Sequence, residues 1–162
     1  MSADEGNCDG SCHQQLQALH DRAAIIEVVS KFAFCIDRRL WADFETCFAD
    51  EIEVNTIRTG RWVRFERQPL IEILRRAFES YTATQHISAN HQVSVEGDAA
   101  TVWSTLNATH YRQGAPGGEF QQQVGYYEYG LVRQDGWKIS SVQQYPHWQA
   151  GNQRIFDSTI EA

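Results

Sequence analysis

The sequence predicts a single α+β domain, because segments with helical periodicity come first and long segments with strand periodicity follow. Its 162 residues suffice for one domain with a core, and a composition of 42% hydrophobic and 12% aromatic residues is that of a globular protein. Helices are expected over residues 14–38, 41–48 and 68–81. Short strands are expected over residues 51–57 and 61–66, and long strands over residues 83–96, 99–112, 119–133 and 136–146.

The first helix is expected to bury one apolar stripe. Its apolar residues recur at spacings of three and four positions: Ile25, Ile26, Val29, Phe32, Ala33 and Ile36. Asp21 could cap a second helical start just before this stripe. One further step of four residues from Ala33 reaches Asp37. This carboxylate either begins the turn "DRRLW" and stays in water, or points into the interior beside a partner.

The next segments continue the helical half of the chain. The sequence "WADFETCF" is expected to form a short helix that turns Trp41, Phe44 and Phe48 inward. Alternation in "EIEVNTI" predicts a strand, and a second short strand is expected beyond Gly60. Pro69 suits the first turn of the third helix, because its missing N–H would be unpaired there in any case.

Two histidines, His86 and His91, lie on the first long strand in the sequence "ATQHISANH". Side chains alternate on a strand, so their odd separation sends them to opposite faces unless a bulge intervenes. The apolar residues that alternate along this strand share a face with His91, which would leave His86 exposed. A polar-lined cavity would reverse the arrangement, with His86, Ser88 and Asn90 as its lining. The alternation alone leaves both arrangements open.

The composition argues against nucleic acids and membranes as partners. The formal net charge of −7 repels phosphate backbones. No apolar run approaches the roughly 20 residues of a membrane span. The N-terminal sequence lacks the apolar core of a secretion signal, so a cytoplasmic location is expected. Residues 1–13 are interpreted as a flexible tail, residues 14–150 as the domain, and residues 151–162 as a C-terminal tail that could close a pocket.

The four cysteines are expected to be thiols in a reducing compartment. Cys8, Cys12 and His13 in "CDGSCH" could offer three ligands, but their spacing is not a standard zinc pattern. The sequence therefore predicts no metal site. Cys35 and Cys47 are expected to behave as small core hydrophobes.

Three stretches of the chain resemble the SnoaL-like branch of the nuclear transport factor 2 superfamily. They are "DRAAIIEVVSKFAFCIDRRLWADFETCFADE", "TQHISANHQVSVEGDAATVWSTLNATHY" and "YYEYGLVRQDGWKIS", and the resemblance extends over residues 14–150. Within that family the chain is similar to scytalone dehydratase and hexachlorocyclohexane dehydrochlorinase. The resemblance implies a cone-shaped, strongly curved antiparallel or mixed sheet wrapped around three helices, with a pocket inside the cone.

The resemblance also implies site residues. Asp37 in "IDRRLW" matches the family's aspartate at the end of the first long helix, and His86 matches its strand histidine. His110 matches a second histidine found in the dehydratase, and Arg133 matches an arginine found in the dehydrochlorinase. On this resemblance Asp37 orients His86 and raises the basicity of its free nitrogen, which gives a base near neutral pH without metal or cofactor. His110 would protonate a leaving hydroxyl or donate to a carbonyl.

The sequence departs from the dehydratase at two tyrosines. Ile36 stands where the dehydratase has a tyrosine, and its second tyrosine falls near Asn55 or Thr56. These departures argue against the dehydratase's own substrate, although not against a related reaction. The expected substrate contacts are Trp41, Asn55, Tyr81, Ser88, Asn90, Tyr127 and Arg133.

These residues together predict a cofactor-independent lyase that acts on a small hydroxylated aromatic or polycyclic molecule. The resemblance implies a dehydration, or a carbon–carbon cleavage like that of superfamily members that release formaldehyde from lignin-derived diaryl compounds. His86 is then expected to face inward, and His91 outward. Trp103 and Tyr111 share the outer face of the second long strand, so a homodimer or homotrimer through that face is expected.

Two other classes of function stay open at the level of sequence. Isomerases and epoxide hydrolases of the same fold rely on carboxylates, and Glu128 is the only candidate for an inward acid on the last two long segments. The fold also serves as a ligand-binding module and as a structural subunit of ring-hydroxylating dioxygenases. Those non-catalytic roles require no Asp–His pair.

Overall fold

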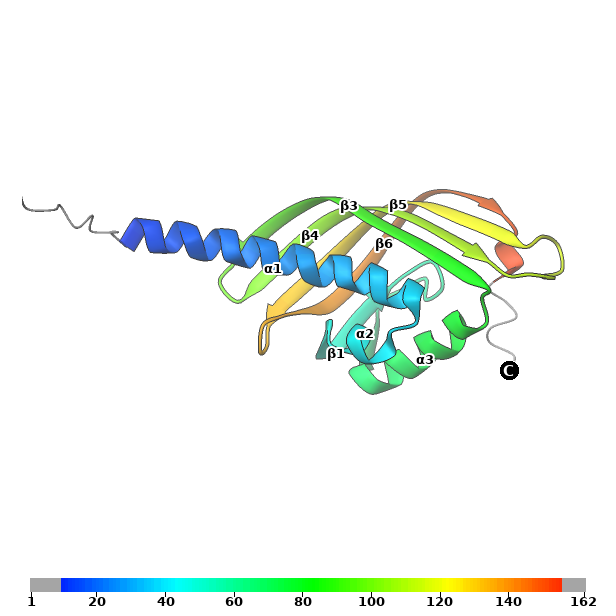
Figure 1. The fold of residues 1–162 in the computed structure, drawn as a ribbon, viewed down its shortest axis with the longest axis horizontal. Coiled ribbons are helices and arrows are strands. Elements are labelled where there is room, and N and C mark those ends of the chain that lie inside the picture. The colour runs from blue at the N-terminus through cyan, green and yellow to red at the C-terminus, as the bar shows by residue number, and fades with distance from the viewer. Residues whose placement is uncertain (1–9, 156–162) are drawn as a thin grey trace, which may run out of the picture.

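A computed structural model of the chain describes residues 10–155 and confirms the α+β fold (Figure 1). Three helices and a six-stranded sheet follow the expected order. The elements are α1 (Gly10–Arg38), α2 (Trp41–Glu45), β1 (Phe48–Asn55), β2 (Val63–Glu66), α3 (Arg67–Glu79), β3 (Ala83–Glu96), β4 (Ala99–Tyr111), β5 (Phe120–Arg133) and β6 (Trp137–Gly151). Within the described residues, no helix is both long and apolar enough to cross a membrane.

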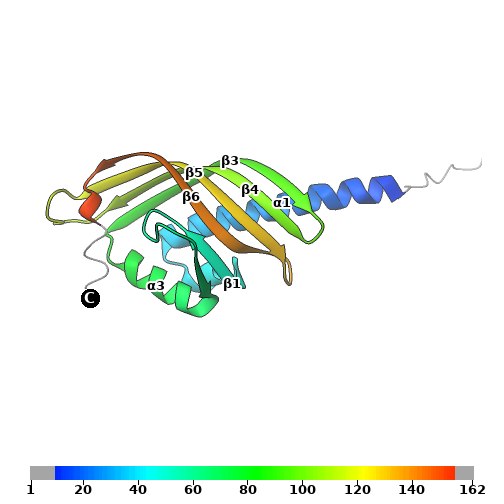
Figure 2. The ribbon, with the colours of Figure 1, turned by 180° about the vertical axis from the view of Figure 1, so that it is seen from behind.

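The sheet is mixed and open, with the strand order β2-β1-β6-β5-β4-β3. Strands β3 to β6 form an antiparallel meander, whereas β1 pairs with β6 in parallel. The four long strands curve over the helices, and α3 lies under the concave side near β1 (Figures 1 and 2). The core therefore lies between the concave face of the sheet and the three helices.

Helix α1 is longer than expected and continuous. It begins at Gly10 rather than at residue 14, and its N-terminal part extends beyond the sheet (Figure 1). Ile25, Val29 and Ile36 are buried against the core, as their spacing predicts. Asp21 lies inside this helix, so the expectation that it caps a second helical start is wrong. Its carboxylate instead binds residues of the last two strands.

A β-bulge in β3 exchanges the two faces of that strand. The register between β3 and β4 shifts between Ala89 and Gln92, and Asn90 adopts a positive φ of 56°. Before the bulge, His86 lies opposite the buried Ala108. After it, Val93 lies opposite the buried Val102 and packs against the core. The inner face therefore carries even-numbered residues before the bulge and odd-numbered residues after it.

The bulge makes the outward placement of His91 wrong. His91 shares the alternation of Val93 and lies on the inner side of the sheet, where it is half-buried. Its Nε2 is shielded from solvent and has no hydrogen-bond partner among the described residues. Burial, followed by the charge of Arg22, lowers the pKa of His91. His86 and His91 thus share one face, which strict alternation forbids.

An ion pair between the buried Asp21 and the partly exposed Arg133 joins α1 to the β5–β6 hairpin. Both terminal nitrogens of Arg133 donate to the Asp21 carboxylate at 2.9 Å, and Trp137 Nε1 donates to Asp21 Oδ1 at 3.0 Å. Arg133 also donates from Nε to Asp98 Oδ1 at 2.9 Å. The hydrogen bonds from Arg133, and then from Trp137, hold the pKa of Asp21 well below its usual range. The carboxylate is therefore charged at neutral pH and anchors the helix to the sheet.

Replacing Asp21 with asparagine is expected to lower the Tm at pH 7, and the difference from wild type should shrink as the pH falls below about 4. A carboxyl whose pKa is lowered by folding stabilises the fold above its unfolded pKa and loses that contribution at lower pH. Thermal unfolding at pH 7 and pH 3 measures this. Asp98→Asn is the matched control, because the Asp98 side chain is 84% exposed and its ion pair should contribute little. Equal losses in the two variants would contradict the assignment.

Candidate active site

A cavity of about 170 Å³ lies between α3, the end of α1 and the concave face of the sheet. Most of its lining is apolar and comes from the helices and from β1, including Phe32, Ile36 and Leu74. Polar side chains also line it. Strands β3, β4, β5 and β6 contribute His86, His110, Gln123, Tyr127 and Gln144, and the segment after β1 contributes Thr56 and Arg58.

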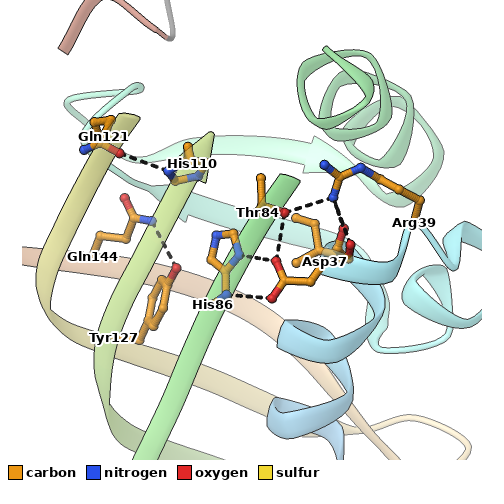
Figure 3. A network of polar contacts seen from close by, with 9 residues as sticks. Asp37, Arg39, Thr84, His86, His110, Gln121, Tyr127 and Gln144 are labelled. Carbon is orange, nitrogen blue, oxygen red and sulfur yellow. Dashed lines mark hydrogen bonds and ion pairs between the residues drawn. The ribbon is translucent and has the colours of Figure 1, made fainter. Parts of the chain in front are cut away.

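His86 reaches this cavity from β3 and is held by Asp37 from the last turn of α1 (Figure 3). His86 Nδ1 lies 2.7 Å from Asp37 Oδ1, and the backbone N–H of His86 donates to Asp37 Oδ2 at 2.6 Å. Thr84 Oγ1 donates to Asp37 Oδ1 at 2.9 Å. The carboxylate thus has three donors, and two of them belong to the residue that it orients.

The charge state of Asp37 decides which nitrogen of His86 carries the proton. Burial alone would raise the pKa of Asp37, but the hydrogen bonds and the charge of His86 outweigh that effect and hold the pKa below its ordinary value. An ionised carboxylate can only accept, so Nδ1 of His86 must be the donor. Nε2 is then the nitrogen with a free lone pair, and the His86 side chain, only 6% exposed, lines the cavity. This arrangement suits a base that acts on a bound molecule.

His110 lies beside His86 on the neighbouring strand β4. The two imidazole rings are 5.3 Å apart, centroid to centroid, and nearly perpendicular. His110 Nδ1 lies 2.9 Å from Gln121 Oε1 on β5. Burial, followed by the charge of His86, lowers the pKa of His110 to about 4. His110 is therefore neutral at pH 7, and its Nδ1–H donates to the amide oxygen of Gln121.

Aromatic side chains enclose the two histidines. The Phe78 ring of α3 lies 5.6 Å from that of His86 and 5.9 Å from that of His110, and the Tyr81 ring lies 5.1 Å from that of His110. Burial raises the pKa of Tyr81 to about 12. These rings exclude water from one side of the histidines. A low-dielectric wall of this kind strengthens the polar interactions inside it.

Two further polar groups face the same space from β5. Gln123 is 4% exposed, and its Nε2 has no hydrogen-bond partner among the described residues. Tyr127 is 3% exposed, its hydroxyl oxygen lies 3.4 Å from the donor Gln144 Nε2, and burial raises its pKa to about 12. The phenol thus keeps its proton. Both groups can donate a hydrogen bond to an oxygen of a bound molecule.

The structure brings together some of the residues that the sequence singles out. Asp37, His86 and His110 form one cluster, and Tyr81 and Tyr127 line the same cavity. Their catalytic and binding roles stay predictions. The strand pattern left open whether His86 is exposed or faces a polar-lined cavity, and in the structure it faces the cavity.

Other expected substrate contacts lie outside the cavity. Trp41 packs edge-on against Phe44, and Asn55 pairs with Gln143 at the end of β1 without lining the cavity. Ser88 hydrogen-bonds Ser104 at 2.8 Å, and Asn90 is exposed at the bulge; neither lines the cavity. The physical reason is that the cavity occupies only the part of the concave face next to α3. Farther along the sheet, α1 covers that face.

Arg133 also lies away from the cavity and is not among the residues that line it, and its contact with a substrate stays a prediction. It comes six residues, or roughly 20 Å of extended strand, after Tyr127 along β5. Its guanidinium carbon lies 4.4 Å from the centre of the Trp137 ring, and its nitrogens form ion pairs with Asp21 and Asp98. It contributes to the stability of the α1–sheet contact.

Several site residues were not found from the sequence. Arg39 and Thr84 complete the hydrogen bonds around Asp37, and Gln121 and Gln123 supply amides on the inner face of β5. The two glutamines had a signal, because they continue the inward alternation of Tyr127 and Tyr129 with polar residues. Arg39 had none, since its role depends on a backbone turn.

The described residues include no group of three or more His, Cys, Asp and Glu side chains placed to hold a metal ion. Cys12 and His13 lie in the first turn of α1, and Cys8 lies outside the described residues. Cys35 and Cys47 are buried free thiols, as expected of core residues. Burial raises the pKa of Cys47 to about 12, so this thiol is unreactive.

Comparison with known proteins places the chain in a family. A profile described as the SnoaL-like domain matches residues 17–143. A comparison with curated protein sequences gives no match. Among solved structures, the Kfla4162 protein from Kribbella flavida is 27% identical, with a TM-score of 0.80 over 86% of this chain and 99% of that chain.

Two further solved structures carry names that describe an activity. A candidate scytalone dehydratase from Novosphingobium aromaticivorans is 18% identical, with a TM-score of 0.73 over 83% of this chain and 89% of that chain. A hexachlorocyclohexane dehydrochlorinase from Novosphingobium barchaimii is 17% identical, with a TM-score of 0.73 over 86% of this chain and 94% of that chain. At these identities the likeness shows a shared fold. Because the profile spans most of the sequence, the chain belongs to the SnoaL-like domain family.

Proposed function

We propose that the protein is a lyase that uses its own side chains as acid and base and acts on a small hydroxylated aromatic or polycyclic molecule. The observation that carries this proposal is the Asp37–His86 pair, whose imidazole lines a largely apolar cavity. The fold that it shares with a dehydrochlorinase, a protein named for an elimination, supports the same class of reaction.

In the proposed elimination His86 both removes and returns a proton. Nε2 takes a proton from carbon, the electron pair of that C–H bond forms a double bond, and the C–O bond to the neighbouring carbon breaks. The proton on His86 then passes to the leaving hydroxyl, which departs as water. Asp37 stabilises the imidazolium that exists between these steps. Atoms and charge balance without any further reactant.

His110 is proposed to bind the substrate rather than to protonate it. His110 lines the cavity, and burial lowers its pKa to about 4, so at neutral pH it carries no imidazolium proton to give to a leaving group. Gln123 and Tyr127 offer donors to a second oxygen, such as a carbonyl on which charge builds up. The aromatic and aliphatic walls fit the rings between these oxygens.

A carbon–carbon cleavage is the closest variant of the proposal. His86 would then remove a proton from the terminal hydroxyl, and the C–C bond to the carbon that bears this oxygen would break to release formaldehyde. The electron pair of that bond would form a C=C double bond as the hydroxyl on the next carbon leaves, and this hydroxyl would take the proton from His86 and depart as water. The same residues serve both reactions. The substrate's oxygen pattern would determine which bond breaks.

An isomerase or epoxide hydrolase is a weaker candidate. Glu128 lies opposite Trp103 on the outer face of the sheet and accepts a hydrogen bond from Tyr145 at 2.7 Å, so it is not directed into the cavity. A purely ligand-binding role would leave the Asp37–His86 pair without a purpose. A catalytic role therefore explains the Asp37–His86 pair, which a ligand-binding role does not.

Two probes test the proposal. The first is 3-hydroxy-1-tetralone, whose loss of water gives fluorescent 1-naphthol, and the second is a 1,2-diarylpropane-1,3-diol, whose cleavage gives a stilbene, formaldehyde and water. We expect the wild-type protein to turn over at least one of them and His86→Ala to turn over neither. Absence of turnover with both probes, in a protein that binds them, would contradict a lyase.

We also expect EDTA to leave turnover unchanged. Loss on chelation and restoration by zinc or iron would reassign Asp37, His86 and His110 as metal ligands.

We also propose that the protein forms a homodimer or homotrimer through the outer face of the sheet. Trp103, Tyr111, Tyr126 and Trp148 are each at least 36% exposed, and Trp103 stacks on Tyr145 at 5.1 Å. Aromatic side chains exposed at this density on one face are unusual for a monomer. Light scattering is expected to give two or three times the chain mass of 18.5 kDa. A mass of one chain would reject the proposal.

A further inference from the structure

The residue that follows α1 has an unexpected identity. Arg39 adopts a left-handed backbone conformation, with φ 58°. It occupies the helix-ending position of a Schellman motif, in which Leu40 N–H donates to Cys35 O at 3.0 Å and Arg39 N–H to Ile36 O at 3.4 Å. Glycine is favoured at this position because it has no Cβ. An arginine there indicates that its side chain supplies something that glycine cannot.

The Arg39 side chain turns back toward Asp37. Its Nη1 donates to the backbone oxygens of Ile36, at 2.6 Å, and of Asp37, at 3.3 Å, and to Thr84 Oγ1 at 2.9 Å (Figure 3). Arginine can only donate, so the Thr84 oxygen accepts from Arg39 and the single hydroxyl hydrogen of Thr84 is free to go elsewhere. It goes to Asp37 Oδ1 at 2.9 Å. The contacts form one directed chain from Arg39 through Thr84 to Asp37 and His86.

We propose that Arg39 and Thr84 are positioning residues that orient the Asp37 carboxylate toward His86. The proposal rests on the proposed function of His86 as a base. Arg39 fixes the direction of the Thr84 hydroxyl, and the hydroxyl holds Asp37 Oδ1 where the imidazole Nδ1 meets it. Neither residue touches the cavity's contents in this scheme.

The chain of hydrogen bonds from Arg39 through Thr84 to Asp37, called the relay below, explains why Arg39 does not bind the Asp37 carboxylate directly. Among the described residues, the ion-pair partner of Asp37 is His86, and Arg39 reaches only the backbone oxygen of Asp37. A guanidinium on the carboxylate would compete with His86 for its oxygens. A hydroxyl placed between them donates a neutral hydrogen bond and leaves the charge of Asp37 to His86.

Arg39 also contacts the wall of the cavity. Its guanidinium carbon lies 5.7 Å from the centre of the Phe78 ring, and that ring packs against His86. Burial lowers the pKa of Arg39, while the charges of Asp37 and Glu79 act in the opposite direction. The same side chain therefore supports the carboxylate and the aromatic wall beside the base.

The relay can be tested without a substrate by NMR of the full chain. The reporter is the proton on His86 Nδ1, whose chemical shift and exchange with water depend on the hydrogen bond to Asp37. Thr84→Val removes the hydroxyl at nearly constant shape, and Thr84→Ser keeps the hydroxyl but removes the methyl group. Arg39→Gly removes the side chain at a position where glycine is favoured. Arg38→Ala is the matched control, since Arg38 is an exposed neighbour that stacks on Phe34.

We expect the Nδ1 proton to shift and to exchange faster in Thr84→Val and Arg39→Gly, but not in Thr84→Ser or Arg38→Ala. The Tm of Arg39→Gly should stay near that of wild type, which separates positioning from folding. Where a probe is turned over, kcat should fall by about 10- to 100-fold with little change in KM, as when an outer hydrogen-bond partner of a functional histidine is lost.

Two results would overturn the relay. One is an Nδ1 proton in Thr84→Val with the chemical shift and exchange rate of wild type. The other is an equal change in Thr84→Val and Thr84→Ser, which would point to the packing of residue 84 rather than to its hydroxyl. The proposed function fails separately. An Nδ1 proton that responds as expected, in a protein that binds both probes and turns over neither, would uphold the relay and reject the lyase.

Discussion

Replacing His86 with alanine, or Asp37 with asparagine, is expected to lower kcat by about 10²- to 10⁴-fold, the usual contribution of a positioned base. His86→Ala removes the nitrogen that takes the proton. Asp37→Asn keeps the size of the side chain but removes the charge that holds Nδ1–H and stabilises the imidazolium. Turnover of whichever probe the wild type accepts measures both effects.

The two losses are not expected to add, because Asp37 has no catalytic use once His86 is gone. The double variant should therefore be about as slow as His86→Ala alone. Asp43→Asn, an exposed carboxylate on the short helix α2, is a matched control for Asp37→Asn. Multiplied losses in the double variant, or an equal loss in the control, would show that the two residues do not act as one unit.

The second large effect concerns stability. His110 has a pKa of about 4 in the fold, against about 6.5 in an unfolded chain, so the unfolded state takes up a proton first as the pH falls. Stability is therefore lost as the pH drops from about 6.5 toward 4. Integrating between these pKa values gives a loss of about 2 kcal/mol at pH 5 from this residue.

His110→Gln removes this titration and isolates it. We expect the variant to lose about 2 kcal/mol less than wild type between pH 8 and pH 5, measured by urea unfolding at each pH. The charged neighbours His86, Asp37 and Arg39 are present in both proteins and largely cancel. The contribution of Asp21 falls outside this window, since it is lost only below about pH 4. Equal losses in the two proteins would show that His110 is not buried as a neutral group.

Most of the helices and long strands were predictable because helical spacing or strand alternation runs through them, with β3 as the exception. The buried stripe of α1 and the alternation of β4 follow the side-chain positions that the structure shows. The resemblance to the family then assigned the curved sheet and the Asp37–His86–His110 cluster. Local periodicity could not have done so, since Asp37 on α1 meets His86 and His110 on β3 and β4 only through the packing of the helix against the sheet.

The bulge in β3 could not be predicted from alternation alone. It is the reason that His91 lies on the inner face of the sheet and not on the outer face, as alternation predicts. A single extra residue at Asn90 moves His91 to the same face as His86. Asparagine tolerates the left-handed conformation better than most residues, so Asn90 carried a weak signal. Polar residues on one half of the strand and apolar residues on the other half are the pattern that such a bulge produces.

The placement of Arg133 and of the Arg39 relay depends on tertiary packing. Arg133 lies at the end of β5 far from α3, and position in the sequence does not reveal which part of the concave face the cavity occupies. The role of Arg39 depends on a left-handed turn that usually takes glycine. Both are contacts between elements, which the sequence of one element does not encode.

The central claim is that Asp37 holds His86 with Nδ1 protonated and with Nε2 free toward the cavity. The ¹⁵N chemical shifts of the two His86 ring nitrogens at pH 7 measure this directly in the unliganded protein. The account predicts a protonated Nδ1 and a bare Nε2 in the wild type, and a mixture of tautomers in Asp37→Asn. A wild-type ring protonated at Nε2 and bare at Nδ1 would contradict it, because no base would then face the substrate.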